Sequence, residues 1–492
     1  MYRPNLAEPR VVVLATALAA TALAATAPAA TAHGHGARAH DARSTPAAPV
    51  ARAPVHRLTL ERIVVSGNQR VATYVIRRHL HLARGDEITA DVIRAARLRL
   101  LATGYFRRVS LTTRRGSTTG SVVLRITVSE RGNPSVETGF GYQDINGWFL
   151  TLIGLRIHNA LGDDSHLRFG LRLGFRIAGA DAEWTKPITR SARYSLAARL
   201  YAYTADQIFY TSDPQTSSGG PGAGFATGAS PATGFRQKIE RGGTEIVLGV
   251  RTGAHSRIEA GVGSVTIRPK NTFSRVNNHD ETFPAGSLPG ALRARNNETT
   301  ISGPVFRAFR DTRNSRVYPT GGSFARVLVN INSTAFGGEE VFSRVRADAR
   351  KHLHLGRGWV SSSRIAAGIT SNNTPYYERF YIGGNYSVRG FPEWSLSAAG
   401  GDDVFWTANE EIRWPVAGRV RHPRVVALAF IDTGSNWQHS GASRAKVYTS
   451  AGWGLRFILP WVGTLGLDAG IPLVKSPTDD PYRVHLSLGF AY

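Results

Sequence analysis

The segment Tyr482–Tyr492 has the sequence YRVHLSLGFAY, in which large apolar residues alternate with small or polar ones. Successive side chains of a β-strand point to opposite faces of a sheet, so this segment predicts a strand with one apolar face and one polar face. The segment Ala451–Phe457 (AGWGLRF) alternates in the same way. Two such segments near the end of the chain indicate that strands dominate this region.

Alternating polarity fills the chain after residue 134, and helical periodicity does not return. Segments of this kind pair with their neighbours as antiparallel strands, so the pattern predicts a mainly β domain over residues 133–492. The sixteen predicted strand segments are 134–145, 147–157, 165–175, 176–187, 193–206, 238–252, 256–269, 298–311, 321–333, 340–355, 359–370, 403–415, 424–437, 446–459, 463–473 and 482–492.

A soluble sandwich and a transmembrane barrel would both show this alternation. Many of the segments reach about ten residues, which is the length that a tilted strand needs to cross a membrane. Aromatic residues recur near segment ends, as they do at membrane interfaces, at Trp148, Trp184, Trp406, Trp414, Trp437 and Trp461. We therefore predict a 16-stranded antiparallel transmembrane β-barrel with its polar, Gly-rich face turned to an aqueous lumen.

The N-terminus carries the features of a secretory signal peptide over residues 1–32. Arg3 and Arg10 precede the apolar run 11–26, and Ala30-Thr31-Ala32 fits a cleavage site of small residues. The Pro- and Ala-rich stretch 33–56 is predicted to be a disordered linker. Its histidines could bind a metal weakly, but we expect no metal site, and the chain has no cysteine to supply one.

The chain is strongly basic, with 60 Lys and Arg residues against 35 Asp and Glu residues and a net charge of +25. Such a charge can indicate nucleic acid binding. Here the basic residues are spread along the strand segments, and no helix or aromatic platform organises them. We therefore predict no nucleic acid partner and interpret the charge as a genome-wide compositional bias, which also suits an anionic membrane surface.

The apolar residues of 57–132 have a different spacing, which predicts a small separate domain. A strand around Ile63 and Val65 is followed by helical spacing over 71–80 and again over about 90–103. Two further strands are predicted over 106–113 and 121–130. The predicted order of elements is therefore β-α-α-β-β.

Three long insertions interrupt the strands, at about 207–235, 271–297 and 371–402. The third contains NYSVRGFPEW, residues 385–394, and an arginine inside a barrel requires a carboxylate or an aromatic face. Two strands later, Phe430, Asp432 and Gly434 share one face of a strand by the period of two. We therefore expect Arg389 to pair with Asp432 and to lie near Phe430.

These motifs together resemble the outer-membrane protein assembly and translocation superfamily that includes BamA and TamA. The small domain resembles one POTRA domain, and the resemblance covers about residues 58–492. The motifs that carry it are Ile63-x-Val65-x-Gly67-Asn68, Gly85-Asp86, Leu100…Gly104-x-Phe106-x-x-Val109, Val122–Glu130, Arg310–Arg313 with Pro319-Thr320-x-Gly322, Phe380-x-x-Gly383-Gly384…Ser387–Phe391, Glu411-x-Arg413-x-Pro415, Phe430-x-Asp432-x-Gly434 and Gly454–Arg456.

The resemblance implies that the sixth surface loop folds back into the lumen and is locked there. The residues of this predicted lock are Arg389, Gly390, Phe391, Phe430, Asp432 and Gly434, and Gly390 allows the close approach. Further residues expected to face the lumen are Glu411, Arg413 and Arg456. One departure is that BamA-like proteins carry several POTRA domains, whereas 57–132 has room for one.

The resemblance also implies that the protein inserts or translocates polypeptides at the bacterial outer membrane, with its POTRA domain in the periplasm. The expected partners are unfolded polypeptide clients, outer-membrane lipid and lipopolysaccharide, and periplasmic accessory proteins. The barrel is expected to open sideways where its first and last strands meet, because Pro134, Gly139 and Gly141 weaken the first strand. Gly489 is expected to help the last strand kink inward.

Two alternatives remain open, a dedicated two-partner-type secretion transporter and a passive outer-membrane pore. The sequence has no G-x-S-x-G and no H-E-x-x-H motif, so we predict neither an enzyme nor a cofactor.

Overall fold

The computed structural model describes most of the chain after the predicted signal peptide and linker, both of which lie outside the described residues. Within the described part, no helix is long and apolar enough to cross a membrane. The described residues are 58–131, 135–143, 147–161, 164–189, 192–211, 233–275, 282–284, 292, 296–315, 318–419, 422–441, 445–459 and 463–489.

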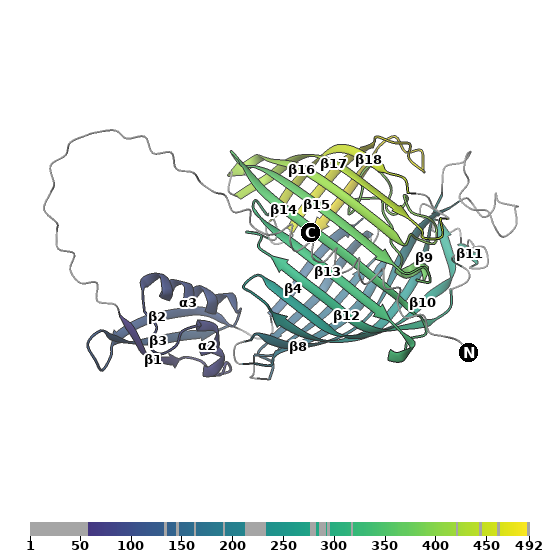
Figure 1. Cartoon of the computed structure of the whole chain (residues 1–492). Coiled ribbons are helices and arrows are strands. Elements are labelled where there is room, and N and C mark those ends of the chain that lie inside the picture. Colours follow the sequence, from purple (N-terminus) through teal and green to yellow (C-terminus); the bar gives the residue numbers. More distant parts are fainter. Residues whose placement is uncertain are drawn as a thin grey trace, which may run out of the picture.

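The first domain has the predicted β-α-α-β-β order and lies at one end of the molecule (Figure 1). Its three-stranded sheet has the order β1-β3-β2, with β1 parallel and β2 antiparallel to the central strand. Both helices pack on one face of this sheet around buried Ile76, Leu100 and Phe106. The elements are β1 (Thr59–Ser66), α2 (Thr73–Leu80), α3 (Ala90–Ala102), β2 (Phe106–Arg115) and β3 (Ser121–Glu130).

Local sequence signals set the limits of α3. The Thr89 side chain accepts a hydrogen bond from the backbone N–H of Val92, which satisfies one of the free donors at the helix start. Gly104 follows the last turn with a φ of +77°, a left-handed conformation that favours glycine. Between these limits, Ala96 and Leu100 are fully buried and carry the apolar stripe predicted from the spacing.

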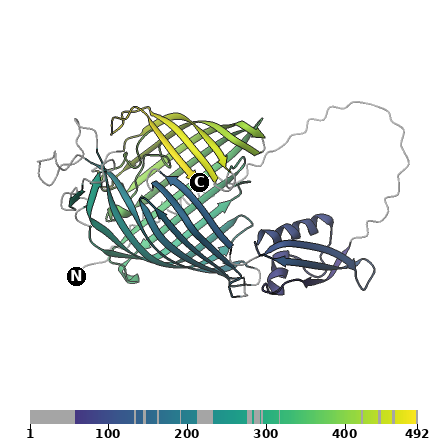
Figure 2. The ribbon, with the colours of Figure 1, turned by 180° about the vertical axis from the view of Figure 1, so that it is seen from behind.

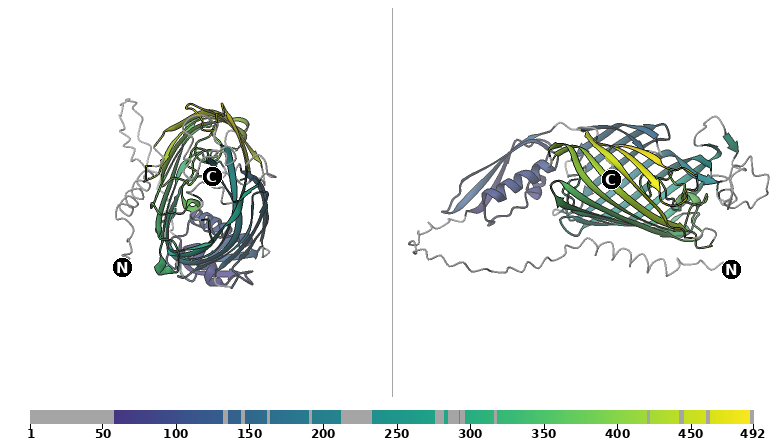
Figure 3. Two further views of the ribbon diagram at one scale, coloured as in Figure 1. Left: turned by 90° about the vertical axis from the view of Figure 1, so that its right-hand side faces the viewer. Right: turned by 90° about the horizontal axis from the view of Figure 1, so that it is seen from above.

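The second domain is a sheet of sixteen long antiparallel strands whose order follows a ring (Figures 1 and 3). A three-residue strand, β11 (Thr282–Pro284), adds to the outer end of β10. The long strands are β4 (Ser135–Gln143), β5 (Gly147–His158), β6 (His166–Gly174), β7 (Ile177–Pro187), β8 (Tyr194–Thr211), β9 (Thr233–Arg251), β10 (Ser256–Arg275), β12 (Thr299–Asp311), β13 (Gly322–Asn332), β14 (Phe342–Gly356), β15 (Trp359–Thr370), β16 (Val404–Arg419), β17 (His422–Trp437), β18 (Tyr448–Leu459), β19 (Gly463–Pro472) and β20 (Arg483–Gly489).

The alternation that predicted the strands also separates their two faces. On β20, His485 and Ser487 are buried within the barrel, whereas Val484 is 54% exposed on the outside. On β18, Arg456 is buried and Trp453 is 60% exposed on the outside. The polar residues therefore face the lumen and the apolar residues face outward, as a membrane-spanning barrel requires.

Three strands extend further than the sequence pattern indicated. β8 continues to Thr211 and β9 begins at Thr233, so the insertion predicted at 207–235 is shorter than expected. β10 likewise runs to Arg275, into the insertion predicted at 271–297. The extended ends of these strands pack aromatic rings together, since Phe235 and Phe273 lie 5.3 Å apart in a buried cluster.

Within the described residues, the ring of strands closes through little pairing. Between 135–143 of β4 and 483–489 of β20 the register contains one residue pair, Leu488 with Tyr142, whereas β19 and β20 pair from Thr464–Gly489 to Gly470–Arg483. Figure 2 shows the last strand, in yellow, beside the first barrel strands, in blue. On the other side of β4, the register with β5 shifts between Glu137 and Gly139, which marks a bulge.

The two domains meet at Asp164, which lies in the turn between β5 and β6 and is 1% exposed. Its carboxylate contacts Arg78 and the Tyr105 hydroxyl, and one of its oxygens lies 3.2 Å from His79 Nε2. All three partners belong to the small domain. Nothing in their sequence spacing signals this junction, because it depends on how two domains dock.

A single carboxylate organises the turn between β1 and α2. Glu130 Oε1 accepts hydrogen bonds from the backbone N–H groups of Gln69, Arg70 and Val71 at 2.9, 3.0 and 2.9 Å. Burial alone would raise the pKa of this carboxyl, but these donors outweigh burial and hold it below the usual 4.5. The last residue of β3 is therefore a charged hydrogen-bond acceptor that holds the turn against the sheet.

Replacing Glu130 by Gln is expected to destabilise the small domain by about 1–3 kcal/mol, because a neutral amide oxygen accepts these three bonds less well. Amide hydrogen exchange over residues 58–131 of the full chain measures the loss. Asp91→Asn, at an exposed helix position, is the matched control and should change exchange little. With native Glu130, protection of 69–71 should persist down to pH 4.5 and fall as the pH drops through its lowered pKa. Equal effects of both substitutions would contradict this role.

Candidate functional site in the barrel lumen

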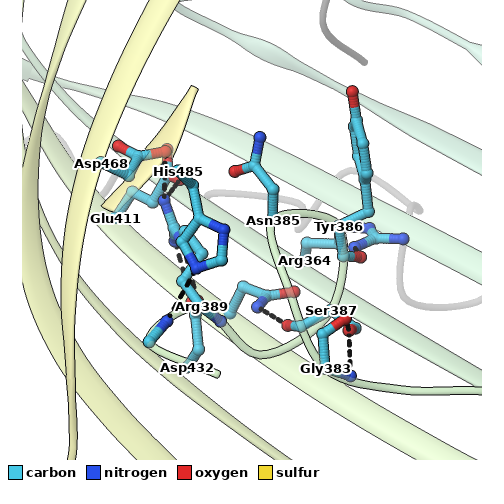
Figure 4. Close-up of polar contacts among 12 residues, drawn as sticks. Arg364, Gly383, Asn385, Tyr386, Ser387, Arg389, Glu411, Asp432, Asp468 and His485 are labelled. Atoms are coloured by element: carbon cyan, nitrogen blue, oxygen red, sulfur yellow. Dashed lines mark hydrogen bonds and ion pairs between the residues drawn. The ribbon is translucent and has the colours of Figure 1, made fainter. Parts of the chain in front are cut away.

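The segment 371–403, between β15 and β16, folds back into the barrel (Figure 4). Its descending part is held by side chains of the neighbouring strands. Arg364 donates from Nη1 to the carbonyl oxygen of Tyr386 at 2.6 Å, and Asn409 donates from Nδ2 to the carbonyl oxygen of Ser387 at 2.6 Å. The loop is therefore fastened to β15 and β16 before it reaches its central arginine.

Arg389 is the largest fully buried side chain of the described residues, with 2% of its area exposed. Its Nε and Nη2 donate to the two carboxylate oxygens of Asp432 at 2.7 and 2.8 Å. Its backbone N–H also donates to Asp432 at 3.0 Å. This two-pronged geometry is the strongest form of ion pair that a guanidinium makes, and it confirms the expected contact between the two residues.

The rest of the Arg389 guanidinium also contacts protein groups. Nη1 donates to Glu411 at 2.7 Å and lies 3.6 Å from Asp468. The guanidinium carbon lies 3.6 Å from the centre of the Phe430 ring, as a cation–π contact requires. Three carboxylates and one aromatic face thus surround one buried cation.

Two of the three carboxylates, Glu411 and Asp468, also pair with other arginines. Arg413 donates from Nε to Glu411 at 2.7 Å, and Arg456 donates from both Nη atoms to Asp468 at 2.7 Å. The predicted lumen-facing residues Glu411, Arg413 and Arg456 therefore lie in one network with Arg389. Buried charges need such complete pairing, because each unpaired one costs several kcal/mol of solvation.

Gly390 brings the loop backbone against the wall. Its φ is +85°, and its N–H donates to His485 Nε2 at 3.1 Å. A Cβ at Gly470, on β19, would lie 2.5 Å from the Gly390 nitrogen, so both positions have room only for glycine. The predicted close approach at Gly390 is present, with β19 and β20 as its surface.

Phe391 and Gly434 complete the packing between the loop and the barrel wall near Arg389. Phe391 is fully buried and packs edge-on against Tyr448, with ring centres 5.8 Å apart. A Cβ at Gly434 would lie 3.1 Å from Val388 of the loop. The small residue on β17 therefore leaves room for the loop segment that precedes Arg389.

The sequence analysis did not identify three residues of this site: Asp468, Gly470 and His485. Asp468 and Gly470 lie on one face of β19, and His485 lies on the polar face of β20. These residues alternate with apolar residues along their strands, and this pattern could have predicted that they face the lumen. The seam glycines, Gly139, Gly141 and Gly489, are not part of this cluster and lie on the two strands where the ring closes.

The network consists of ion pairs between arginines and carboxylates. In the described part of the chain, no cluster of His, Asp and Glu side chains has the arrangement of a metal site. What the geometry can do is hold a long loop at a fixed depth in the lumen.

A barrel of strands with polar residues inside, preceded by one β-α-α-β-β domain, defines a class of outer-membrane proteins. The Omp85 superfamily domain matches residues 159–492, and a POTRA domain of the surface antigen variable number repeat type matches residues 58–131. The chain belongs to the Omp85 superfamily. The protein is accordingly located in the bacterial outer membrane, with its POTRA domain in the periplasm.

The chain is also similar in sequence to a curated BamA protein. The chain is 22% identical over 447 residues to the outer membrane protein assembly factor BamA of Nitratidesulfovibrio vulgaris, covering 87% of this chain and 50% of that protein. It therefore spans half the length of this relative.

Solved structures show the same fold. BamA from Haemophilus ducreyi lacking POTRA domains 1–3 has a TM-score of 0.67 at 18% identity, covering 88% of this chain and 84% of that one. CdiB from Acinetobacter baumannii has a TM-score of 0.53 at 15% identity, covering 89% and 74%. CdiB from Escherichia coli has a TM-score of 0.55 at 12% identity, covering 88% and 76%.

Asp432→Asn should destabilise the folded barrel by about 3–5 kcal/mol, because it leaves the buried Arg389 cation short of one carboxylate. The temperature at which the compact, fast-migrating form disappears in semi-native electrophoresis measures the loss. Asp181→Asn is the control, since its pair with Arg168 is partly exposed and should contribute less than about 1 kcal/mol. Similar melting temperatures for the two variants would contradict the central role of the pair.

Gly470→Ala is expected to displace the loop, because the added methyl group meets the Gly390 backbone, which cannot move without breaking its bond to His485. Protease accessibility of the loop in purified protein detects the displacement. Gly263→Ala is a matched strand control, since its Cβ would meet no atom closer than 3.7 Å. A protected loop in the Gly470 variant would show that the close approach does not hold it.

Proposed function

We propose that this protein inserts or translocates polypeptides at the outer membrane, using the POTRA domain to receive them and the barrel seam to release them. The observation that carries the proposal is the closure of the ring, where the described residues of β20 and β4 show the one pair Leu488–Tyr142. Every other neighbouring pair of long barrel strands is joined over most of its length. Among the described residues the seam is the place in the sheet with the least strand pairing, so we expect it to open at low cost compared with other places.

The POTRA sheet has one edge suited to an incoming chain. Residues 85–88 already bond to the start of β1, with Leu60 N–H donating to the Asp86 carbonyl oxygen at 2.8 Å. The edge at β2 lies on the opposite side of the sheet. An extended polypeptide that adds to β2 would be bound through main-chain hydrogen bonds, which accept many sequences.

The proposed clients are unfolded outer-membrane or exported polypeptides. Lipid and lipopolysaccharide would surround the apolar outer face of the barrel, and periplasmic accessory proteins would deliver the clients. The relatedness to BamA supports assembly of outer-membrane proteins as the main role. The likeness to CdiB keeps a dedicated secretion transporter as a second candidate. No catalytic step, cofactor or nucleic acid takes part in the proposal.

A disulfide between Tyr142→Cys and Leu488→Cys would test the seam, because these residues are direct partners in the register and facing strand positions lie within disulfide reach. The chain has no native cysteine to interfere. We expect oxidation in membranes to abolish activity and reduction to restore it. Activity is read as outer-membrane integrity together with the levels of barrel proteins and secreted proteins.

The matched control joins Leu455→Cys to Leu467→Cys, a facing pair on β18 and β19 away from the seam, and should leave activity unchanged. Normal activity with the seam locked would refute lateral opening and favour a passive pore. If only one secreted protein is lost while barrel proteins stay at their usual levels, the dedicated transporter is the better assignment.

A further inference from the structure

A cavity in the lumen lies between the inserted loop and the wall formed by β14, β15 and β16. Its volume is about 310 Å³, which reaches the size of small-molecule pockets in proteins. The turn between β5 and β6 meets the POTRA domain through Asp164, and the long strands alternate in direction. The start of β14, and with it the cavity, is therefore at the other end of the barrel. Figure 4 shows Gly383, Tyr386 and Ser387 of its wall.

Arg346 of β14 lines this cavity and has no counter-ion of its own. It makes no hydrogen bond or ion pair with any residue that the structure describes, and its Nε is buried without a partner. Asp348 lies two residues further along the same face of β14. The Asp348 oxygens accept instead from Arg350 and Arg364, at 2.8 and 2.7 Å. Buried polar groups normally have partners, so the free N–H groups of Arg346 indicate a place for a ligand.

Two aromatic rings hold Arg346 and its neighbour Arg344 in position. The guanidinium carbon of Arg346 lies 5.6 Å from the centre of the Phe405 ring. That of Arg344 lies 4.8 Å from the centre of the Phe380 ring. The two rings pack with their centres 4.7 Å apart, and a Cβ at Gly368 would lie 2.6 Å from each of them. Each ring supports one face of a guanidinium and leaves its N–H edge available for hydrogen bonds.

The buried atoms without partners around the cavity are all able to donate. Besides Arg346, these are Arg344 Nε and the Tyr377 hydroxyl, neither of which has a hydrogen-bond partner among the described residues. Arg344 lies 3.6 Å from Glu378, but that carboxylate also pairs with Arg241. A guanidinium N–H can only donate, and a phenol hydroxyl donates readily. The ligand must therefore supply several acceptor atoms, and the two guanidinium groups favour an anion.

Trp394 gives the cavity an apolar wall on the loop side. Its φ is +65°, a left-handed conformation that is rare for a bulky side chain. Its backbone N–H donates to the Gly383 carbonyl oxygen at 3.3 Å, and its ring packs against Tyr381 with centres 5.4 Å apart. Strained positions of this kind are concentrated at binding sites. The indole therefore offers a surface for the organic part of an anionic ligand.

We propose that this cavity binds a phosphate group, free or carried by a small organic ester. A phosphate group has at least three acceptor oxygens, which suits donors that reach the cavity from two positions on β14 and from the loop. A carboxylate has two oxygens, and the planar fork of a single guanidinium already satisfies both. The volume of the cavity and the Trp394 wall leave room for an organic part. Binding here requires neither a client polypeptide nor an open seam, so the inference is independent of the proposed function.

Isothermal titration calorimetry of the full chain in detergent micelles tests the site, with glycerol phosphate as the probe. Inorganic phosphate and acetate are the comparison ligands. We expect glycerol phosphate to bind at least ten-fold more tightly than acetate, since each further hydrogen bond to a charged group contributes that much. Whichever of glycerol phosphate and inorganic phosphate binds more tightly identifies the ester or the free ion as the ligand. Equal binding of glycerol phosphate and acetate, or no binding of either phosphate at millimolar concentration, would overturn the proposal.

Substitutions of the donors locate the binding. Arg346→Gln should weaken glycerol phosphate by at least ten-fold, whereas Arg346→Lys should weaken it less, because it keeps the charge and loses the fork. Tyr377→Phe removes one hydroxyl and should weaken binding by about ten-fold. The control is Arg199→Gln, since Arg199 also lies over a ring, 5.2 Å from the centre of Tyr201, but is outside this cavity. Equal losses in the Arg199 and Arg346 variants, or no loss in any, would contradict the site.

Thermal stability separates a role of Arg346 in binding from a role in the fold. Because Arg346 has no ion pair to lose among the described residues, Arg346→Gln should leave the barrel as stable as before or more stable. The melting temperature of the compact form in semi-native electrophoresis measures this. A variant that melts well below the native protein would show that Arg346 supports the fold, and would overturn its assignment as a ligand-binding group.

Discussion

The buried ion pair between Arg389 and Asp432 is the constraint on which the rest of the barrel depends. A guanidinium with 2% of its area exposed has lost nearly all of its hydration, and its removal from water costs several kcal/mol unless carboxylates replace it. Asp432, Glu411 and Asp468 supply that replacement from three different strands. The wall and the loop therefore stabilise each other, because neither set of charges is satisfied alone.

This arrangement makes the two sides of the seam unequal. The loop contacts Asp432 on β17, Gly470 on β19 and His485 on β20, so the strands that lead to the C-terminal edge share one internal support. On the opposite edge, β4 carries a bulge, and its described residues join those of β20 through a single residue pair. An opening at the seam would consequently move β4 away from an edge that the loop holds in place.

The sequence predicted the strands and the central pair because both follow from a period of two residues. Phe430, Asp432 and Gly434 share a face by counting alone, and an arginine in a long insertion needs such a face. Gly470 and His485 were missed because their role depends on where three separate strands bring the loop backbone. The junction at Asp164 was missed for the same reason, since its partners lie about 60 to 85 residues away.

Positive charges in the lumen and positive charges on the protein surface have different physical roles. In the lumen, arginines such as Arg413 and Arg456 are bound to carboxylates, so their charge is largely cancelled and their geometry is fixed. On the outer face of the POTRA sheet, Arg108, Arg114 and Arg125 are exposed, and no ion pair is recorded for them among the described residues. Exposed charges of this kind contribute to a long-range field, which screening limits to about 10 Å. The net charge of the chain is therefore a poor guide to the lumen, where arginines and carboxylates lie side by side in ion pairs.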